Sequence, residues 1–228
     1  MVSSMDIQLA REKSKKLGIS QVQIVREEYE MFLLSKIFDS TLGKKLVFRG
    51  GTALRLAYGS PRFSEDLDFS GIEPIKEKDF LKWCRETAED NLYLELKEAL
   101  KKKFTLFALF KIKDPALDET ISIKIEISVR DVKWEKDRDY KLVKLQSEVT
   151  PLTVLAQVAR PERIEKEKLS ISPKRIRDIF DLWFLGQILK KEYKMNFSGF
   201  KPSEVKRELY RLLPLSVKRL IEPWLPKE

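Results

Sequence analysis

The sequence predicts an α+β protein, with an α/β lobe over residues 1–150 that includes N-terminal helices and a mostly helical lobe over residues 151–228. Two patterns support this division. Residues 104–130 are rich in β-branched and aromatic residues, and their second half alternates apolar with polar positions as strands do. After about residue 150 the apolar residues recur at helical spacing instead. With 228 residues, 43% of them hydrophobic, the chain can bury one sizeable core or two modest ones.

The first half of the chain is expected to begin with helix and then to alternate between strands and helices. Residues 20–42 carry apolar side chains mostly three and four positions apart, which predicts an amphipathic helix that ends at Gly43. A short strand, a helix and a second strand follow, and their expected ranges are 45–49, 52–58 and 65–70. A helix is expected over residues 76–90, and residues 92–103 fit either a helix or a strand.

The second half is expected to open with a β-hairpin and to continue as helices. Residues 104–112 and 120–130 flank a segment whose proline and aspartates favour a turn, so they should pair as antiparallel strands. In the second strand Ile125 and Ile127 face one side, while Lys124 and Glu126 face the other. Helices should follow, several beginning near a proline, and their expected ranges are 161–169, 173–193, 201–213 and 215–225.

The composition excludes several classes of chemistry. Histidine is absent, which excludes Ser-His-Asp and Cys-His catalysis and histidine-ligated metal enzymes. Cys84 is the single cysteine, so no internal disulfide or multi-cysteine zinc site can form. Any acid, base or metal ligand must therefore be a carboxylate.

The charge balance is basic and nothing in the sequence indicates a membrane. Forty-five lysines and arginines against 36 acidic residues give a net charge of +9, which suits an anionic partner such as nucleic acid, a nucleotide or an acidic protein. A surface of interspersed charges would have the same net value. No apolar stretch approaches membrane-spanning length, and the N-terminus lacks a secretory pattern, so we expect a cytoplasmic protein.

Asp66 and Asp68 are the first candidates for a metal site. On a strand, residues two apart point to the same side with Cα atoms about 6.5–7 Å apart, so two carboxylates can converge on a hard cation such as Mg²⁺. Leu67 and Phe69 would anchor the opposite face of the strand in the core. The alternative is an exposed strand edge that simply carries charge.

The segment before this pair predicts a phosphate site. A strand that ends at Gly50-Gly51-Thr52 and continues into a helix presents backbone N–H groups and a hydroxyl to an anion. Fifteen residues separate Gly51 from Asp66, enough for a short helix and a turn to bring the glycines beside the carboxylates. One complex of a triphosphate with a metal would satisfy both features.

Glu126 is the best candidate for a third carboxylate, which a two-metal site requires. Its strand has the same design as the strand of Asp66 and Asp68, with one apolar face and one polar face. The alternative is an ion pair between Glu126 and Lys124 or Arg130. Asp131 is a reserve candidate at the expected end of the strand.

Three blocks in order resemble one family. GGTALRLAYGSPRFSEDLDF is similar to the first motif of the AbiEii/AbiGii abortive-infection nucleotidyltransferases, toxin components of toxin–antitoxin pairs in the DNA polymerase β superfamily. KIEIS fits the strand of their third carboxylate, and PERIEKEKLSISPKRIRDIFDLWFL resembles their later motifs, so the similarity spans roughly residues 44–190. The resemblance implies a polymerase β-like mixed sheet with flanking helices, followed by the helical lobe.

The resemblance also implies roles for individual residues. Asp66, Asp68 and Glu126 would be catalytic ligands of Mg²⁺ or Mn²⁺, although many relatives have Asp in place of Glu126. The positions that match nucleotide-binding ones are Gly50, Gly51, Thr52, Arg62, Ser64, Lys168 and Asp181. Lys166 offers a competing alignment for Lys168, and Asp178 pairs with Asp181 in the family's Asp-x-x-Asp motif. On a helix, Arg177 and Asp181 lie four apart and can form an ion pair.

The implied function is transfer of a nucleoside monophosphate from an NTP to an acceptor hydroxyl, with RNA, such as the 3′ end of tRNA, as the expected acceptor. A protein hydroxyl is a second possible acceptor, and a cognate antitoxin protein is an expected partner. Two alternatives belong to other classes: a nucleotide- or RNA-binding module without catalysis, and a metal-dependent phosphohydrolase that uses the same carboxylates.

Overall fold

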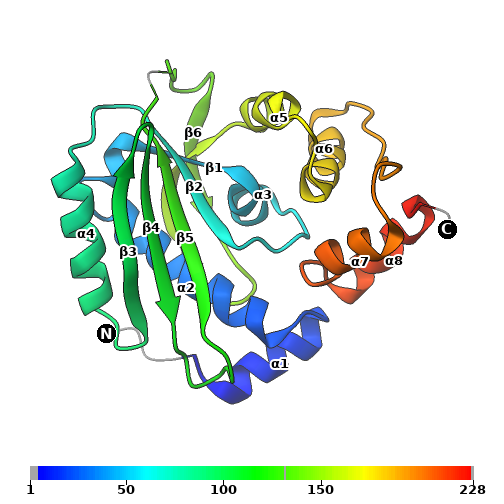
Figure 1. The fold of residues 1–228 in the computed structure, drawn as a ribbon, viewed down its shortest axis with the longest axis horizontal. Helices are drawn as coiled ribbons and strands as arrows, with labels where there is room; N and C mark the ends of the chain where they lie inside the picture. Colours follow the sequence, from blue (N-terminus) through cyan, green and yellow to red (C-terminus); the bar gives the residue numbers. More distant parts are fainter. Residues whose placement is uncertain (1–4, 131, 227–228) are drawn as a thin grey trace.

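A single mixed sheet organises the protein. The computed structural model describes residues 5–130 and 132–226, and within them the sheet has seven strands in the order β3-β4-β5-β2-β1-β7-β6 (Figure 1). Strands β3, β4 and β5 form an antiparallel meander, β2 lies parallel to β5 and antiparallel to β1, and β1 lies parallel to β7. The α+β class with a mixed sheet and flanking helices is therefore confirmed.

The central strands place their polar residues on one face of the sheet. They are β1 (Leu46–Arg49), β2 (Asp66–Gly71) and β5 (Ile121–Ser128). Burial alternates along β5, and Leu67 and Phe69 of β2 are fully buried on the same side as its isoleucines. In the parallel pairing of β2 with β5, Asp68 is the register partner of Glu126, and Asp66 that of Lys124.

Of the helices from the first half of the chain, α2 and α4 pack on the apolar face of the sheet. Phe38 at the end of α2 packs on Phe69, and Trp83 of α4 packs edge-on against Phe110 of β4. The helices of this half are α1 (Ile7–Leu17), α2 (Gln21–Phe38), α3 (Gly50–Tyr58) and α4 (Glu77–Glu89). Since α3 starts at the residue after β1, its first turn lies directly at the end of a central strand.

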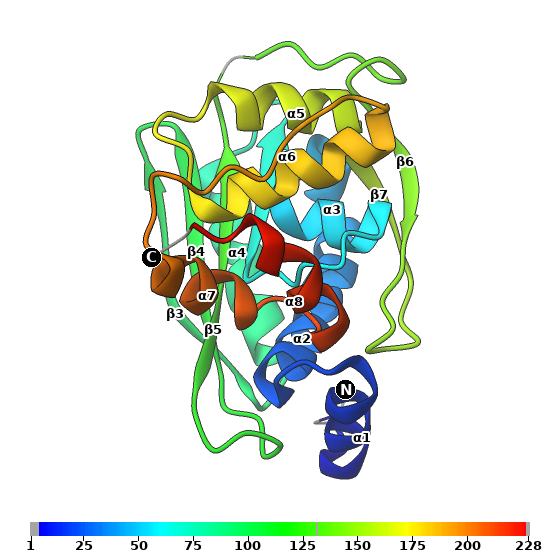
Figure 2. The same cartoon turned by 90° about the vertical axis from the view of Figure 1, so that its right-hand side faces the viewer.

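The C-terminal helices stand opposite the polar face. Figure 2 shows α5 and α6 lying side by side, with α7 and α8 below them. The four helices are α5 (Pro161–Ser170), α6 (Ile176–Leu189), α7 (Pro202–Tyr210) and α8 (Leu215–Ile221). Part of this region has a hydrophobic cluster of its own, which includes Phe180, Phe197 and Leu209.

Most elements lie where the sequence pattern predicts them. The ambiguous segment forms a strand, β3 (Leu94–Lys102), which pairs with β4 (Thr105–Ile112). Two strands were not expected, β6 (Tyr140–Leu145) and β7 (Val154–Ala159). β7 lies beyond residue 150, the expected start of the helical lobe, and its six residues are too few to show a period that separates strand from helix.

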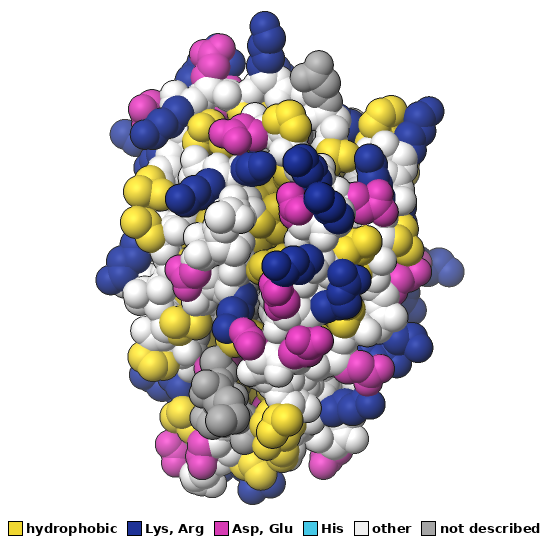
Figure 3. Space-filling view, turned by 90° about the vertical axis from the view of Figure 1, so that its left-hand side faces the viewer, with side chains coloured by type: hydrophobic (Ala, Val, Ile, Leu, Met, Phe, Trp, Pro, Cys, Tyr) yellow, Lys and Arg dark blue, Asp and Glu magenta, His cyan; other side chains and the backbone are white. Residues whose placement is uncertain are grey.

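The described surface carries both signs of charge. On the face shown in Figure 3, lysines and arginines are interspersed with aspartates and glutamates. The excess of positive charge is thus not gathered into one block on this face. Among the described residues, no helix has the length and apolarity that a membrane crossing requires.

Candidate active site

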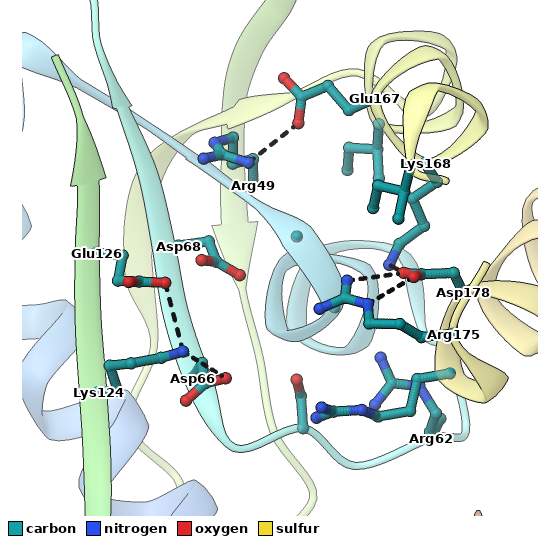
Figure 4. Close-up of a pocket in the computed structure, with 16 residues that line it drawn as sticks. Arg49, Arg62, Asp66, Asp68, Lys124, Glu126, Glu167, Lys168, Arg175 and Asp178 are labelled. Atoms are coloured by element: carbon teal, nitrogen blue, oxygen red, sulfur yellow. Dashed lines mark hydrogen bonds and ion pairs between the residues drawn. The ribbon is translucent and has the colours of Figure 1, made fainter. Parts of the chain in front are cut away.

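The carboxylates of β2 and β5 line a cleft between the sheet and the C-terminal helices (Figure 4). Of the residues selected from the sequence, eight line this cleft: Gly50, Gly51, Arg62, Ser64, Asp66, Asp68, Glu126 and Lys168. Because β2 and β5 are adjacent and parallel, Asp68 and Glu126 lie side by side, and Asp66 lies one step back along β2 on the same face.

The glycine turn is shaped by close contacts with the acidic and basic side chains. Gly50 has φ of +81°, a conformation that favours glycine, and a Cβ there would lie 2.6 Å from the Oδ2 atom of Asp68. A Cβ on Gly51 would collide with the guanidinium of Arg62 and lie 2.9 Å from the hydroxyl of Ser64. Any side chain at either position would therefore fill the space where the helix start meets the cleft.

Thr52 differs from the expectation that its hydroxyl faces an anion. The residue is fully buried, and its hydroxyl donates a hydrogen bond to the backbone carbonyl of Asp66 at 2.5 Å. Thr52 thus fastens the first turn of α3 to the start of β2. The backbone of this turn and Ser64 remain at the cleft.

Lys124 lies between two of the three carboxylates. Its ammonium is 3.4 Å from Asp66 and 3.3 Å from Glu126, and Figure 4 shows it bridging the two strands. The alternative in which Glu126 pairs with Lys124 is therefore realised. Burial alone would lower the pKa of Lys124, but the two carboxylates outweigh it and raise that pKa, so the ammonium form is favoured.

The pKa of Asp68 is raised above its ordinary value. Burial is the main cause, and the charges of Asp66 and Glu126 add to it, while the nearby Arg49 opposes the rise. Asp68 therefore holds a proton more readily than an exposed aspartate does.

The donor set suits a hard divalent cation. Three carboxylates with oxygen ligands converge from two adjacent strands, which is the ligand chemistry that Mg²⁺ and Mn²⁺ prefer. Within the described residues, however, no group of three acidic or cysteine side chains already encloses a metal position. The ammonium of Lys124 lies between Asp66 and Glu126, where it offsets the repulsion of these two carboxylates.

A buried ionic network forms the opposite wall of the cleft. Arg62 donates to both oxygens of Asp181, at 2.7 and 2.9 Å, and Lys168 lies 2.7 Å from Asp181 and 2.8 Å from Asp178. Arg175 completes the network with hydrogen bonds of 2.6 and 3.0 Å to Asp178. Although burial alone would raise the pKa of Asp181, Arg62 and Lys168 hold it below its usual range.

The network separates residues that reach the cleft from residues that support them. Asp181 is fully buried behind Arg62 and Lys168 and does not line the cleft. Lys168 has three N–H donors and two carboxylate partners, so one donor remains to point into the cleft. Of the two competing lysines, Lys168 lines the cleft, whereas Lys166 is exposed on the outer side of α5.

The expected pair between Arg177 and Asp181 does not form. Arg177 instead lies 3.1 Å from Glu208 of α7 and 3.7 Å from Glu65. Asp181 instead pairs with the buried Arg62, which comes from the segment between α3 and β2. Helical spacing alone therefore does not determine the partner of Asp181. Asp131 lies outside the described residues.

Sequence reasoning missed Arg49 and Arg175 as residues of the site, and it named Lys124 only as a possible partner of Glu126. Two of these three residues carried a usable signal. Arg49 directly precedes the glycine turn, and Lys124 shares the polar face of its strand with Glu126. Arg175 precedes α6 and its position at the cleft depends on how the helix docks, which local spacing does not reveal.

Comparison with known families supports the same region. The family described as "Nucleotidyl transferase AbiEii toxin, Type IV TA system" matches residues 32–201, from within α2 to the residue before α7. This span contains every residue discussed at the cleft. A comparison with curated protein sequences finds no match.

Solved structures share the fold. JHP933 from Helicobacter pylori superposes with a TM-score of 0.54 and 22% identity, covering 91% of this chain and 84% of that chain. MenT4, a nucleotidyltransferase toxin from Mycobacterium tuberculosis, gives a TM-score of 0.62 and 17% identity, covering 80% of this chain and 65% of that chain. This chain thus spans slightly less than two thirds of MenT4, and at these identities the likeness concerns the fold.

Proposed function

Because this chain belongs to the AbiEii family of nucleotidyltransferase toxins, we propose that it transfers a nucleoside monophosphate from an NTP to an acceptor hydroxyl, with Mg²⁺ or Mn²⁺ as cofactor. One observation carries the proposal: the carboxylates of Asp66, Asp68 and Glu126 share a cleft with a glycine turn and with buried cationic side chains. The first feature suits a divalent cation and the second suits a triphosphate.

The glycine turn and the network hold the triphosphate in this proposal. The N–H groups of the first turn of α3 point toward the N-terminus of the helix, which is the positive end of its dipole. The glycines in this turn let a phosphate approach the backbone. Arg62 and Ser64 add donors beside Gly51, and Lys168 adds donors from α5. Asp181 does not line the cleft itself and acts by positioning Arg62 and Lys168.

The carboxylates have two roles in this proposal, metal binding and proton acceptance. Asp66, Asp68 and Glu126 would hold the metal, which when bound neutralises the developing charge and activates the acceptor hydroxyl. In the transfer, the acceptor oxygen forms a bond to the α-phosphorus, the bond to the bridging oxygen breaks, and pyrophosphate leaves. With no histidine in the chain, Asp68 or Glu126 accepts the hydroxyl proton.

The acceptor in this proposal is RNA, such as the 3′ end of tRNA. The net charge of +9 favours an encounter with a polyanion. Membership of a family described as part of a type IV toxin–antitoxin system supports a cognate antitoxin as partner.

Labelled nucleotides test the reaction directly. Incubating the protein with total cellular RNA, Mg²⁺ and each α-labelled NTP in turn should label RNA with at least one of them. Free nucleoside monophosphate as the only product would instead identify a phosphohydrolase. Nucleotide binding without turnover, measured in a single-turnover assay, would identify a binding module.

Two substitutions tie the reaction to the cleft. Asp66→Ala and Asp68→Ala should each abolish transfer and any toxicity, because each removes a carboxylate from the cleft. Asp118→Ala, an exposed aspartate on the turn between β4 and β5, is the matched control and should keep full activity. Near-normal transfer by either cleft variant would refute the assignment.

A further inference from the structure

A second cleft lies beside the first and shares residues with it. Its volume is about 340 Å³, and Arg49, Glu167 and Ile171 line both clefts. The residues that distinguish the second cleft come from the ends of β2 and β5, from the segment after β5 and from α5: Ser70, Ser128, Arg130, Trp134 and Arg163. The two clefts are therefore adjacent, and the ion pair between Arg49 and Glu167 lies at their boundary.

The floor of the second cleft continues the polar face of the sheet. Ser70 follows Asp68 by two residues on β2, Ser128 follows Glu126 by two residues on β5, and the two serines are register partners. Both hydroxyls therefore lie on the carboxylate face, about 6.5–7 Å further along the strands. A chain that follows this floor reaches the carboxylates from the side of Asp68 and Glu126.

The proposed triphosphate site lies at the other end of the carboxylate row. Arg62 and Ser64 precede Asp66 by four and two residues in the chain, and both border the space above Gly51. An in-line displacement needs the attacking oxygen and the leaving oxygen on opposite sides of the phosphorus. An acceptor hydroxyl that arrives from the side of the second cleft meets this requirement.

The walls of the second cleft combine positive charge with an aromatic ring. The guanidinium of Arg163 lies over the ring of Trp134, 4.5 Å from its centroid. Arg49 and Arg130 add two further positive charges, and Glu167 is the acidic residue of the lining. Cationic grooves with aromatic side chains on which bases stack are how proteins bind single-stranded nucleic acid.

The arginines of this cleft keep unused hydrogen-bond donors. Glu167 lies 3.2 Å from Arg49 and 3.7 Å from Arg163. Even so, the Nε atoms of Arg49 and Arg163 are buried and have no hydrogen-bond partner among the described residues. Each guanidinium has five N–H groups, more than these contacts use, so other donors are left for a ligand with anionic oxygens.

We infer that the second cleft, defined by Ser70, Ser128, Arg130, Trp134 and Arg163, binds the 3′-terminal nucleotides of a single-stranded RNA acceptor. The arginines contact its phosphates, a base stacks on the pair of Arg163 and Trp134, and the terminal hydroxyl reaches Asp68 and Glu126. This inference rests on the proposed nucleotidyl transfer, because that reaction needs an acceptor hydroxyl opposite the leaving group. A nucleic-acid ligand uses both the charge and the ring, which a protein hydroxyl on a short side chain does not.

RNA binding can be measured independently of transfer. The probe is a fluorescein-labelled single-stranded RNA of about 12 nucleotides with an unblocked 3′ hydroxyl, titrated with the full-length protein and followed by anisotropy. Trp134→Ala should weaken binding about 5- to 150-fold, the range found for one lost base stack. Trp224→Ala, a partly exposed tryptophan near the C-terminus, is the matched control and should bind like the wild type.

A surface charge reversal covers the case in which Trp134→Ala does not fold. Arg130 is exposed, so Arg130→Glu should fold normally, weaken RNA binding and reduce its salt dependence by about one phosphate contact or more. The apparent affinity for NTP, measured by thermal shift on the same variants, should stay unchanged.

The outcomes separate this inference from the proposed function. Unchanged RNA binding in both variants would overturn the inference, even if the wild type transfers nucleotides. Loss of NTP affinity in place of RNA affinity would also overturn it, because the cleft would then hold the nucleotide base. Weaker RNA binding in a protein that labels no acceptor with any NTP would support the cleft as an RNA site while refuting nucleotidyl transfer.

Discussion

Replacement of Asp181 by Asn should destabilise the protein more than any change to a surface ion pair. Asp181 is fully buried and joins Arg62 of the α/β lobe to Lys168 and α6 of the helical lobe. Asparagine keeps the volume of the side chain but removes its charge. The substitution therefore leaves a buried guanidinium, whose side chain is only 3% exposed, without a full counter-charge.

The expected magnitude follows from the burial of the pair. Breaking a buried ion pair by removing one partner costs about 3–5 kcal/mol in free energy of unfolding. For a chain of this size, 1 kcal/mol corresponds to about 2–4 °C in Tm, so Asp181→Asn should lower Tm by about 6–20 °C. The pKa of Asp181 is lower in the folded protein than in the unfolded chain, where it is about 4. The stabilisation by Asp181 is therefore fully present above the unfolded pKa and is lost as the pH falls through the folded pKa.

The assay is thermal unfolding at pH 7, repeated at decreasing pH. Arg211→Gln is the matched control: Arg211 also bridges the two lobes, with bonds of 2.6 and 2.8 Å to Glu65, but its side chain is 49% exposed. Loss of this exposed pair should cost about 1 kcal/mol or less. Equal Tm values for the two variants would refute the reasoning. So would a difference in Tm between the wild type and Asp181→Asn that becomes larger as the pH is lowered.

Three further predictions concern the cleft and the core behind it. Gly50→Ala should lower the stability of the protein and its affinity for NTP, because a Cβ at φ of +81° would be strained and would lie 2.6 Å from Asp68. The affinity is measured as the gain in Tm on adding nucleotide. Gly59→Ala is the control for backbone strain alone, since Gly59 has φ of +75° with open space around it. Lys124→Met should lower the Tm of the metal-free protein, because Asp66 and Glu126 lose the ammonium that they share. For the same reason, adding Mg²⁺ in the absence of nucleotide should raise the Tm of the variant more than that of the wild type. Equal Tm gains with Mg²⁺ would contradict this prediction. Glu30→Gln should stabilise the protein at pH values above the unfolded pKa of glutamate, about 4.3. Burial, then the charge of Glu27, raises the pKa of Glu30, so the free energy of unfolding of the wild type falls by up to about 1.4 kcal/mol per pH unit as the pH rises from the unfolded pKa to the folded one. Identical pH profiles of the two proteins in denaturant titrations would exclude it.

The strands that carry the carboxylates were predictable because their spacing is local information. Two-residue spacing on a strand determines which side chains share a face, so Asp66, Asp68 and the polar face with Glu126 followed directly from the alternation. The start of α3 at Gly50 was also close to the prediction, since glycines followed by helix-forming residues mark such a turn.

The partners of these side chains were not predictable, because they depend on how distant elements pack. The spacing of Arg177 and Asp181 allowed an ion pair, but α6 turns Asp181 toward Arg62 and turns Arg177 toward Glu208. Thr52 is similar: its position in the motif suggested an exposed hydroxyl, and the approach of β2 supplies a backbone carbonyl instead. Local patterns specify faces, and tertiary packing specifies which groups meet across them.

The ammonium of Lys124 has a practical consequence for handling the protein. Because this side chain lies between Asp66 and Glu126, the acidic row does not rely on an added ion to offset its repulsion. Treatment with EDTA should then leave the protein folded and inert, in contrast to zinc-finger domains, which unfold when stripped. Adding back a divalent salt should restore activity at once, without a refolding step.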